Sequence, residues 1–184
     1  MIRPIYLYGA DVLRQKAAEA DLSKKDELLA LVQDLKDTLR TADGCGLAAP
    51  QIGVSLRVVI VDGDVVSDTY DYLKGFRRTF INPTITEESA EKSTYSEGCL
   101  SIPGIYCDIT RPKRITVEYY DEDLKKVTET FDNFASRMIQ HELSHLEGEL
   151  FTDLAAPIRK KMISGKLQNI IKGKVHPRYN SRLK

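Results

Sequence analysis

The stretch Q-H-E-L-S-H-L-E-G at residues 140–148 holds two of the three histidines in this sequence. His141 and His145 are four residues apart, slightly more than one helical turn, so a helix here projects both rings from one face. Their ring nitrogens can then share a metal ion, with Glu142 beside the ion rather than on it. Two histidines packed against ordinary neighbours would give the same pattern. The rest of the chain must decide between these readings.

The residues around this stretch predict a buried helix. Asp132 can cap its first turn, and Gly148 suits its C-terminal end. Two stripes recur at helical spacing, one of Phe134, Met138, His141 and His145, the other of Ala135, Ile139, Leu143 and Leu146. A helix with two such stripes contacts the protein interior on two sides.

The other segments predict two more helices and several strands. A helix opens at Ser23, with Asp26 three residues later, and ends near Asp43-Gly44; its apolar positions are Leu28, Leu31, Val32, Leu35 and Leu39. R-V-V-I-V at 57–61 and T-F-I-N-P at 79–83 are typical of strands, the second ending at Pro83. I-T-V-E-Y-Y at 115–120 and V-T-E-T-F at 127–131 indicate a hairpin. After Pro157 an amphipathic helix is expected from Ile158, Met162, Leu167, Ile170 and Ile171, with Gly165 as a weak point and Gly173 as its stop.

These elements predict an α+β fold. We expect a single compact domain over residues 1–184, with antiparallel strands around the buried H-E-x-x-H helix and an amphipathic helix near the C-terminus. A length of 184 residues with 42% hydrophobic and 29% charged side chains suits one globular domain with a substantial core.

Composition also narrows the setting in which the protein works. No apolar run approaches the roughly 18 residues that a membrane span needs, and residues 1–9 do not have the pattern of a secretory signal. Three cysteines without a C-x-x-C pair argue against a disulfide framework. We therefore expect a cytoplasmic protein with free thiols and no membrane association.

The formal net charge is zero, but the charge is unevenly distributed. Residues 154–184 contain no Asp or Glu and nine basic residues, namely Arg159, Lys160, Lys161, Lys166, Lys172, Lys174, Arg178, Arg182 and Lys184. Such a basic tail is either a solvated helix face or a contact with a polyanion such as ribosomal RNA; DNA is not an expected partner.

If the two histidines bind a metal, a third ligand is needed. A third histidine six residues after the second is one known arrangement, but Phe151 stands there, and no glutamate follows Glu149. Asp153 and His176 remain downstream. A cysteine upstream is the better candidate, because a thiolate and two imidazoles suit a tetrahedral site whose fourth position holds water.

Three cysteines compete for that role. Cys99, in E-G-C-L-S, follows a polar stretch where a strand can end and expose its thiol. Cys45 and Cys107 have weaker surroundings for a ligand, and any of the three can equally be a small buried apolar residue.

Three motifs together resemble those of the peptide deformylases. They are G-C-G-L-A-A-P-Q at 44–51, E-G-C-L-S at 97–101 and Q-H-E-L-S-H-L-E-G at 140–148, in the family's order and separation, and the similarity covers nearly the whole chain. The resemblance implies that Cys99, His141 and His145 bind one divalent ion. In the family this ion is typically ferrous iron, which zinc, nickel or cobalt can replace.

The resemblance also implies a reaction, the removal of formate from the N-formylmethionine of nascent polypeptides. Glu142 would move the proton, while the Gln51 side chain and the Leu100 backbone N–H would stabilise charge on the carbonyl oxygen. Gly46 would allow close backbone approach. Cys45, Phe134 and the face of His141 would line a methionine pocket, and the basic tail gains the ribosome as a candidate partner.

Two alternative functions stay open at this stage. A metallopeptidase that cleaves ordinary amides should carry one of the missing third ligands. A structural metal module that binds RNA through the basic tail should close its coordination shell with four protein ligands.

Two positions depart from the family pattern. Ser144 stands where relatives commonly have aspartate, and Tyr106 stands near where many have an arginine that helps to hold the peptide. Arg111 is the cation expected to pair with that aspartate. Here it must find a hydroxyl, another carboxylate or water.

Overall fold

The computed structural model describes residues 1–184 and contains three sheets, three α-helices and five short 3-10 helices. The largest sheet is antiparallel, with strands in the order β2 (Gly46–Ala48), β3 (Val58–Asp62), β4 (Arg77–Glu88), β7 (Arg114–Tyr120) and β8 (Lys126–Asp132). The two smaller sheets are an antiparallel hairpin of β5 (Lys92–Cys99) and β6 (Ile102–Pro112), and a parallel pair of β1 (Ile5–Tyr6) and β9 (Ser181–Arg182). The α-helices are α1 (Lys25–Ala42), α2 (Asn133–Leu146) and α3 (Pro157–Ile171). The 3-10 helices are η1 (Asp11–Arg14), η2 (Ala49–Ile52), η3 (Asp64–Val66), η4 (Asp71–Leu73) and η5 (Phe151–Leu154).

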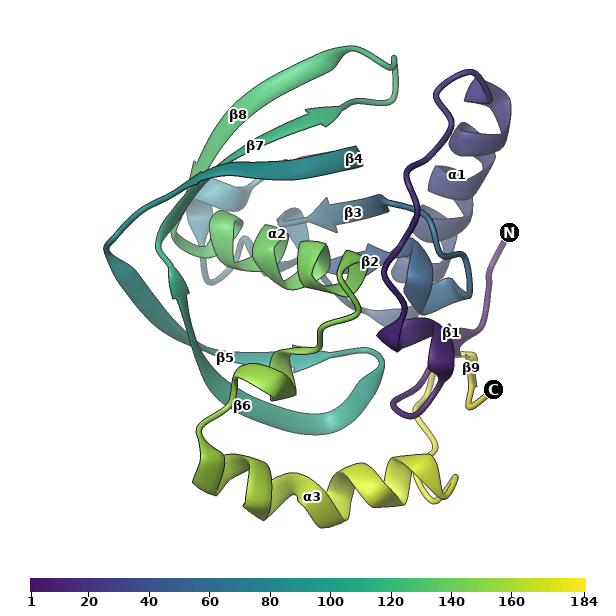
Figure 1. The fold of residues 1–184 in the computed structure, drawn as a ribbon, viewed down its shortest axis with the longest axis vertical. Coiled ribbons are helices and arrows are strands. Elements are labelled where there is room, and N and C mark those ends of the chain that lie inside the picture. The colour runs from purple at the N-terminus through teal and green to yellow at the C-terminus, as the bar shows by residue number, and fades with distance from the viewer.

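The helix that carries the two histidines lies at the centre of the molecule. Figure 1 shows α2 between the large sheet and the β5–β6 hairpin, with α3 beyond the hairpin. Eleven of the fourteen residues of α2 are buried, as its two stripes predict. The predicted α+β domain, with antiparallel strands around a buried helix, is confirmed.

Three apolar clusters hold these layers together. Met138, Ile139 and Leu143 of α2 pack with residues of the large sheet such as Val59 and Phe80. A second cluster joins α1 to β2 and β3, and a third joins β6 to α3. Because burying apolar surface is the dominant favourable term in folding, α2 is fixed mainly by its contact with the sheet.

Both ends of α1 can be compared with the sequence prediction. The helix ends as expected, with Asp43 in the left-handed conformation at φ 59° and its N–H donating to the Leu39 carbonyl. The predicted start at Ser23 is wrong. Lys24 occupies the capping position, while the Ser23 backbone N–H and hydroxyl donate to the Asp21 carboxylate at 3.0 and 2.7 Å. Asp132 does precede α2, but its side chain does not cap the first turn.

Pro83 does not end its strand, which corrects a second prediction. β4 continues to Glu88, and its register against β7 shifts between Ile81 and Thr84. Proline lacks an N–H and is tolerated in a strand at such an irregularity. Asn82, at φ 49°, fixes the bend by exchanging side-chain hydrogen bonds with the Ala20 backbone. β4 thereby extends toward the turn that leads into β5 (Figure 1).

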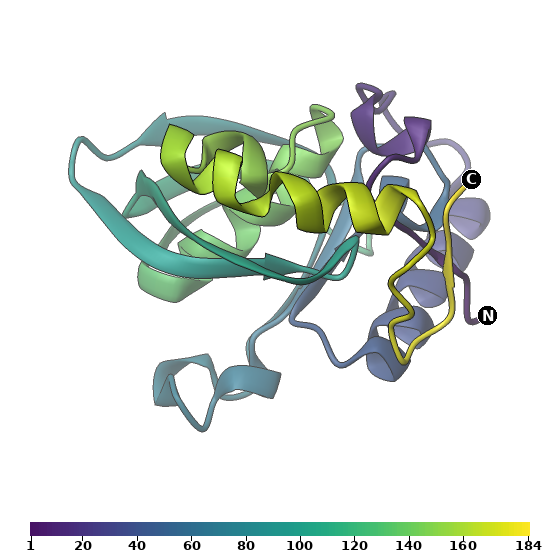
Figure 2. The ribbon, with the colours of Figure 1, turned by 90° about the horizontal axis from the view of Figure 1, so that it is seen from below.

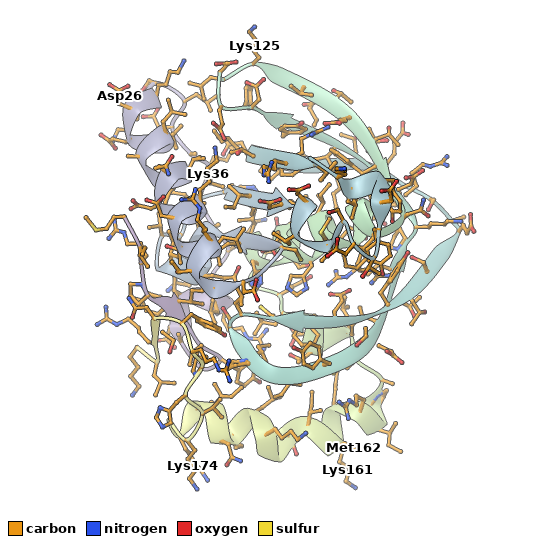
Figure 3. The ribbon with its side chains drawn as sticks, turned by 180° about the vertical axis from the view of Figure 1, so that it is seen from behind. Asp26, Lys36, Lys125, Lys161, Met162 and Lys174 are labelled. Carbon is orange, nitrogen blue, oxygen red and sulfur yellow. The ribbon has the colours of Figure 1, made fainter.

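The C-terminal helix also differs in detail from its prediction. α3 runs through Gly165 without a break, and it buries Ile163, Leu167 and Ile170 against the hairpin. Ile158, Met162 and Ile171 were expected on the apolar face, but they are 73%, 66% and 42% exposed. Figure 3 shows Met162 pointing outward beside Lys161. None of the helices has the length and apolar character of a membrane span.

The backbone that follows α2 requires glycine at position 148. Gly148 has φ +72°, and a Cβ there would lie 2.6 Å from the Arg14 carbonyl oxygen. We expect Gly148→Ala to lower the free energy of unfolding by about 1–3 kcal/mol or more, since a left-handed conformation and a backbone contact both oppose the methyl group. Urea denaturation followed by circular dichroism measures this change.

The matched control is Gly165→Ala, in the middle of α3. No atom lies within 4 Å of the added Cβ. This variant should gain up to about 1 kcal/mol, because alanine favours a helix over glycine. Equal stability of both variants would contradict the described backbone at Gly148.

Candidate metal centre

The three sequence motifs meet at one place in the fold. Cys99 ends β5, and His141 and His145 lie on α2; one donor atom from each falls within 4.8 Å of the others. The Cys99 Sγ lies 3.5 Å from the His145 Nε2, and the two imidazole rings are 5.4 Å apart between centroids. This is the one group of three or more potential ligands in the structure.

The end of the β5–β6 hairpin sets the position of Cys99. The register shifts between Glu97, which pairs with Cys107, and Cys99, which pairs with Ile102. Across this irregularity both side chains still contact α2, Glu97 through His141 and Cys99 through His145. Gly98 between them leaves room for Tyr106, whose ring would lie 2.5 Å from an added Cβ.

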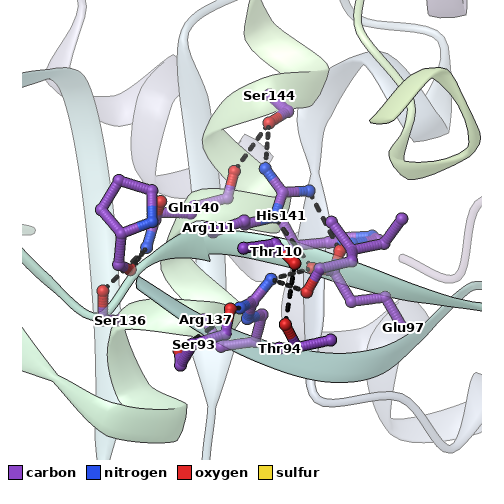
Figure 4. A network of polar contacts seen from close by, with 12 residues as sticks. Ser93, Thr94, Glu97, Thr110, Arg111, Ser136, Arg137, Gln140, His141 and Ser144 are labelled. Atoms are coloured by element: carbon purple, nitrogen blue, oxygen red, sulfur yellow. Dashed lines mark hydrogen bonds and ion pairs between the residues drawn. The ribbon is translucent and has the colours of Figure 1, made fainter. Parts of the chain in front are cut away.

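A buried carboxylate fixes the first histidine. Glu97 Oε1 lies 2.8 Å from His141 Nδ1, and the same carboxylate accepts two hydrogen bonds from Arg111 at 2.8 and 3.0 Å and one from Arg137 at 2.7 Å. Figure 4 shows these side chains meeting between the hairpin and α2. Burial acts to raise the pKa of Glu97, but the hydrogen bonds from His141 and Arg111 outweigh it and hold the pKa well below its usual value.

An ionised carboxylate can only accept hydrogen bonds, so the proton between the two residues belongs to His141 Nδ1. With Nδ1 engaged by Glu97, Nε2 is the ring nitrogen of His141 that remains for an ion shared with Cys99 and His145. A carboxylate behind the histidine is a common support of metal-binding imidazoles.

The two arginines connect the carboxylate to the surrounding backbone. Arg111 Nη1 donates to the Ser144 hydroxyl at 3.1 Å, and that hydroxyl donates to the Gln140 carbonyl at 2.9 Å. Arg111 therefore has both a hydroxyl and a carboxylate as partners. Arg137 donates to the Ile109 and Ser93 carbonyls at 3.0 and 2.6 Å.

Glu142 points to the other side of the histidines, toward β2. A Cβ at Gly46 would lie 2.6 Å from its Oε1, so only glycine leaves space for this carboxylate. Its Oε2 is buried and has no hydrogen-bond partner within the protein. Burial raises the pKa of Glu142 to about 7.

The residues present fit a divalent metal ion. A thiolate and two imidazoles are a typical donor set for such an ion, and three protein ligands leave one position for water. The unpartnered Oε2 of Glu142 is a buried acceptor that such a water would satisfy.

Gln51, in η2, presents a hydrogen-bond donor to the same place. Its Oε1 accepts the Ala48 N–H at 2.9 Å, which fixes the orientation of the amide. Its Nε2 donates to the Ser101 hydroxyl at 3.0 Å and lies 3.5 Å from the Cys99 Sγ.

A pocket of about 1020 Å³ opens beside the candidate ligands. Its lining includes all the remaining residues named from the sequence as binding or catalytic, namely Cys45, Gly46, Gln51, Leu100, Phe134 and Glu142. Phe134 stacks on Tyr70 with ring centroids 4.4 Å apart. Burial raises the pKa of the Cys45 thiol to about 12, so this thiol stays protonated at neutral pH.

The competing ligands lie elsewhere. Cys107 is buried in the apolar cluster between β6 and α3, and Asp153 pairs with Arg14 at 2.7 Å. His176 does not belong to the cluster of potential ligands. Phe151, at the position of a third histidine in other H-E-x-x-H proteins, packs beside His141 with a centroid distance of 5.8 Å.

Sequence reasoning missed four residues of this region. Glu97 opens the E-G-C-L-S motif, yet it received no role; an acidic residue two positions before a candidate ligand was the available signal. Arg137 was signalled as a charged residue within a helix whose two stripes predict burial. Arg178 and Tyr179, which also line the pocket, carry no signal in a polar tail.

Comparisons of the sequence with protein families and with known proteins all identify the same family. The family model described as polypeptide deformylase matches residues 2–161. A peptide deformylase of Flavobacterium psychrophilum is 44% identical over 192 aligned positions, covering 100% of this chain and 97% of the relative. One of Cytophaga hutchinsonii is 41% identical over 182, covering 99% and 97%.

Solved structures give the same result. A crystal structure of a peptide deformylase from Legionella pneumophila is 33% identical, with a TM-score of 0.82, and covers 95% of this chain and 98% of that one. A peptide deformylase from Plasmodium falciparum in complex with an inhibitor is 33% identical, with a TM-score of 0.80, covering 91% and 99%.

Fold and site together define an H-E-x-x-H hydrolase in which a cysteine accompanies the two histidines. The family match and the relatives narrow this class further. The chain belongs to the polypeptide deformylase family and is an enzyme of that type.

The buried carboxylate yields a stability prediction. Glu97→Gln should lower the free energy of unfolding by about 3–5 kcal/mol, because it leaves two buried guanidinium groups without their counter-ion. The control is Glu91→Gln, whose partner Lys113 lies 3.0 Å away on the surface; it should change stability by at most about 1 kcal/mol. Guanidinium denaturation of metal-free samples measures both, and a loss at Glu97 no larger than at Glu91 would contradict the network.

Proposed function

We propose that this enzyme removes the formyl group from the N-terminal N-formylmethionine of newly synthesised polypeptides, with the help of one divalent metal ion. The observation that carries the proposal is the arrangement around α2. A Cys/His/His group within 4.8 Å adjoins a buried, unpartnered carboxylate oxygen and opens onto a pocket.

Cys99, His141 and His145 would hold the metal, with ferrous iron as the native ion and Zn²⁺, Ni²⁺ or Co²⁺ able to replace it. Such an ion polarises a carbonyl oxygen and lowers the pKa of a bound water toward neutrality. The Glu97 carboxylate supports this role by holding the proton of His141 on Nδ1, away from the other two ligands.

Glu142 is the proposed proton carrier. It takes a proton from the attacking water, whose oxygen forms a bond to the formyl carbon. When the carbon–nitrogen bond breaks, the same carboxylate delivers that proton to the departing amine nitrogen. The products are formate and a peptide with a free methionine amino group.

Gln51 and Leu100 are the proposed donors to the formyl oxygen, on which negative charge develops during the attack. The Gln51 amide is already oriented by the Ala48 N–H, so its Nε2 needs no rearrangement to donate. Cys45 and Phe134 would line the site of the methionine side chain, together with the face of His141. Gly46, which has no side chain, would let the substrate backbone approach closely.

The substrate also bears on where the enzyme works. Since nascent chains emerge from ribosomes, we propose that the reaction takes place in the cytoplasm. We also propose that residues 1–184 form the single domain that carries it out. The basic tail from about residue 154 is a candidate contact with the ribosome. Lys161 and Lys174 point outward from it, which supports such a contact (Figure 3).

Two other functions are less well supported. For a metallopeptidase, the third ligand would be a histidine or glutamate, whereas Phe151 occupies one such position. For a structural metal module, a fourth protein ligand would be needed, and the group contains three.

One experiment separates the three functions. Metal-loaded protein is incubated with formyl-Met-Ala-Ser and acetyl-Met-Ala-Ser, formate and free amines are measured, and metal content is determined. The proposal expects formate from the first peptide and little reaction with the second. Cleavage between Met and Ala would indicate a peptidase, and bound metal without any turnover would indicate a structural module.

Replacing the proposed proton carrier should separate chemistry from metal binding. Glu142→Gln keeps all three ligands and should retain one metal ion per chain. Formate release should fall by about 10²–10⁴-fold, the usual contribution of general acid–base catalysis. Near-normal turnover by the metal-replete variant would remove Glu142 from this role.

The two cysteines of the β5–β6 hairpin provide a matched pair. Cys99→Ala should lose most of its metal and its activity, because one of three ligands is missing. Cys107→Ala removes a thiol from the apolar cluster and should retain metal, with a modest loss of stability. Metal analysis of both folded variants is the measurement, and the ligand set is wrong if their metal contents are reversed.

A further inference from the structure

The C-terminal segment after α3 ends beside the N-terminal strand β1. Figure 2 shows it looping at the end of α3, on the side of the molecule where both termini lie. β9 pairs in parallel with β1, and the Ile5 and Leu7 N–H groups donate to the Asn180 and Arg182 carbonyls at 2.9 Å each. Val175 and Leu183 pack against the apolar cluster between β6 and α3. The segment is therefore fixed on both sides of residues 177–179.

Those three residues line the same pocket as Cys99 and Glu142. Pro177, Arg178 and Tyr179 form a part of its wall that is distant in sequence from the three motifs. The chain enters and leaves this wall through fixed contacts, so its position does not depend on a bound ligand.

Tyr179 ties the wall to the site itself. Its hydroxyl donates to the Leu100 carbonyl oxygen at 2.5 Å. Burial raises the pKa of Tyr179 well above its usual value, so the hydroxyl stays protonated and can only donate to that carbonyl. The side chains of Tyr179 and Leu100 also pack against the apolar cluster that joins α1 to β2 and β3. Leu100 directly follows Cys99, and the hydrogen bond restrains its backbone.

Arg178 is the charged group that this wall adds to the pocket. It is exposed and forms no ion pair or hydrogen bond within the protein. The other cation of the lining, Arg137, is buried and paired with Glu97 at 2.7 Å. An unpaired guanidinium at the edge of a substrate pocket can donate to peptide carbonyl oxygens, and its planar group suits that role better than an ammonium group does.

We propose that the segment Pro177–Tyr179 is a substrate-binding wall, in which Arg178 donates to the peptide backbone beyond the methionine while Tyr179 is a positioning residue for Leu100. The inference rests on the proposed deformylase function. The C-terminal segment would bind the peptide backbone, whereas the three motifs would provide the catalytic residues and the metal ligands.

The test for Arg178 compares substrates of two lengths. With formyl-Met-Ala-Ser, Arg178→Ala should raise KM about tenfold at unchanged kcat, as expected for the loss of a charge-assisted hydrogen bond. With N-formylmethionine, which has no following residues, Arg178→Ala should leave KM unchanged. For the tripeptide, Arg178→Lys should have a KM between those of the unaltered protein and Arg178→Ala. Lys125→Ala, which removes one exposed charge at the opposite end of the molecule (Figure 3), is the control. An unchanged KM for the tripeptide would overturn the role of Arg178.

The test for Tyr179 is a change of one oxygen atom. Tyr179→Phe keeps the packing and should lower kcat about 3–10-fold for both substrates with little change in KM, since only a restraint on Leu100 is lost. Thermal stability is measured for Tyr179→Phe and Tyr179→Leu as well. If kcat falls only in proportion to the loss of thermal stability in both variants, Tyr179 is a purely structural residue.

A binding measurement separates this inference from the proposed function. The metal-loaded protein is titrated calorimetrically with the product peptide Met-Ala-Ser. Weaker binding by Arg178→Ala supports the wall even if no formate is released, in which case the proposed function alone fails. Formate release by the unaltered protein together with equal binding by both forms overturns the wall and leaves the function intact.

Discussion

The buried carboxylate of Glu97 is the constraint on which the site depends. It accepts hydrogen bonds from two arginines and faces the Nδ1 of His141, and so joins β5, β6 and α2 at one point. Breaking a buried pair is costly because the remaining charge cannot be solvated, even though the intact pair adds little net stability. Its contribution is positional. Cys99 is two residues further along the same strand, and the carboxylate therefore sets the distance between the hairpin and the helix that carries the other two potential ligands.

The central helix satisfies two demands at once. Met138, Ile139 and Leu143 bind it to the large sheet by ordinary apolar packing. Its remaining sides carry Arg137, His141 and Glu142, which are nearly as buried but polar. A polar side chain in this position must be paired or must face a ligand. Arg137 and His141 are paired with the Glu97 carboxylate, whereas Glu142 forms no ion pair and keeps an unpartnered, buried oxygen on the side of β2.

Much of this arrangement could be predicted from the sequence, since it follows from local patterns. Helical spacing places His141 and His145 on one face, and the two stripes of this helix, one of which contains both histidines, predict its burial. The order of the three motifs indicated the family. Local patterns failed where tertiary contacts decided the outcome. Pro83 lies in a strand because a register shift accommodates it, and Met162 is exposed because α3 turns the face of Ile163, Leu167 and Ile170 toward the hairpin.

The largest omission concerns contacts between distant segments. Glu97, in a recognised motif, shows its role only once Arg111 and Arg137 converge on it from β6 and α2. Arg178 and Tyr179 line the pocket directly before β9, which pairs with β1; these are two strands of two residues each at opposite ends of the chain. Strands this short leave no periodic signal in a sequence.

X-ray absorption at the zinc edge of the zinc-loaded protein shows whether one thiolate and two imidazoles form an open metal site. We expect one sulfur at about 2.3 Å and two imidazole nitrogens at about 2.0–2.1 Å, with a further light atom completing a four-coordinate shell. A shell without sulfur, or one containing two sulfurs, would contradict this ligand set.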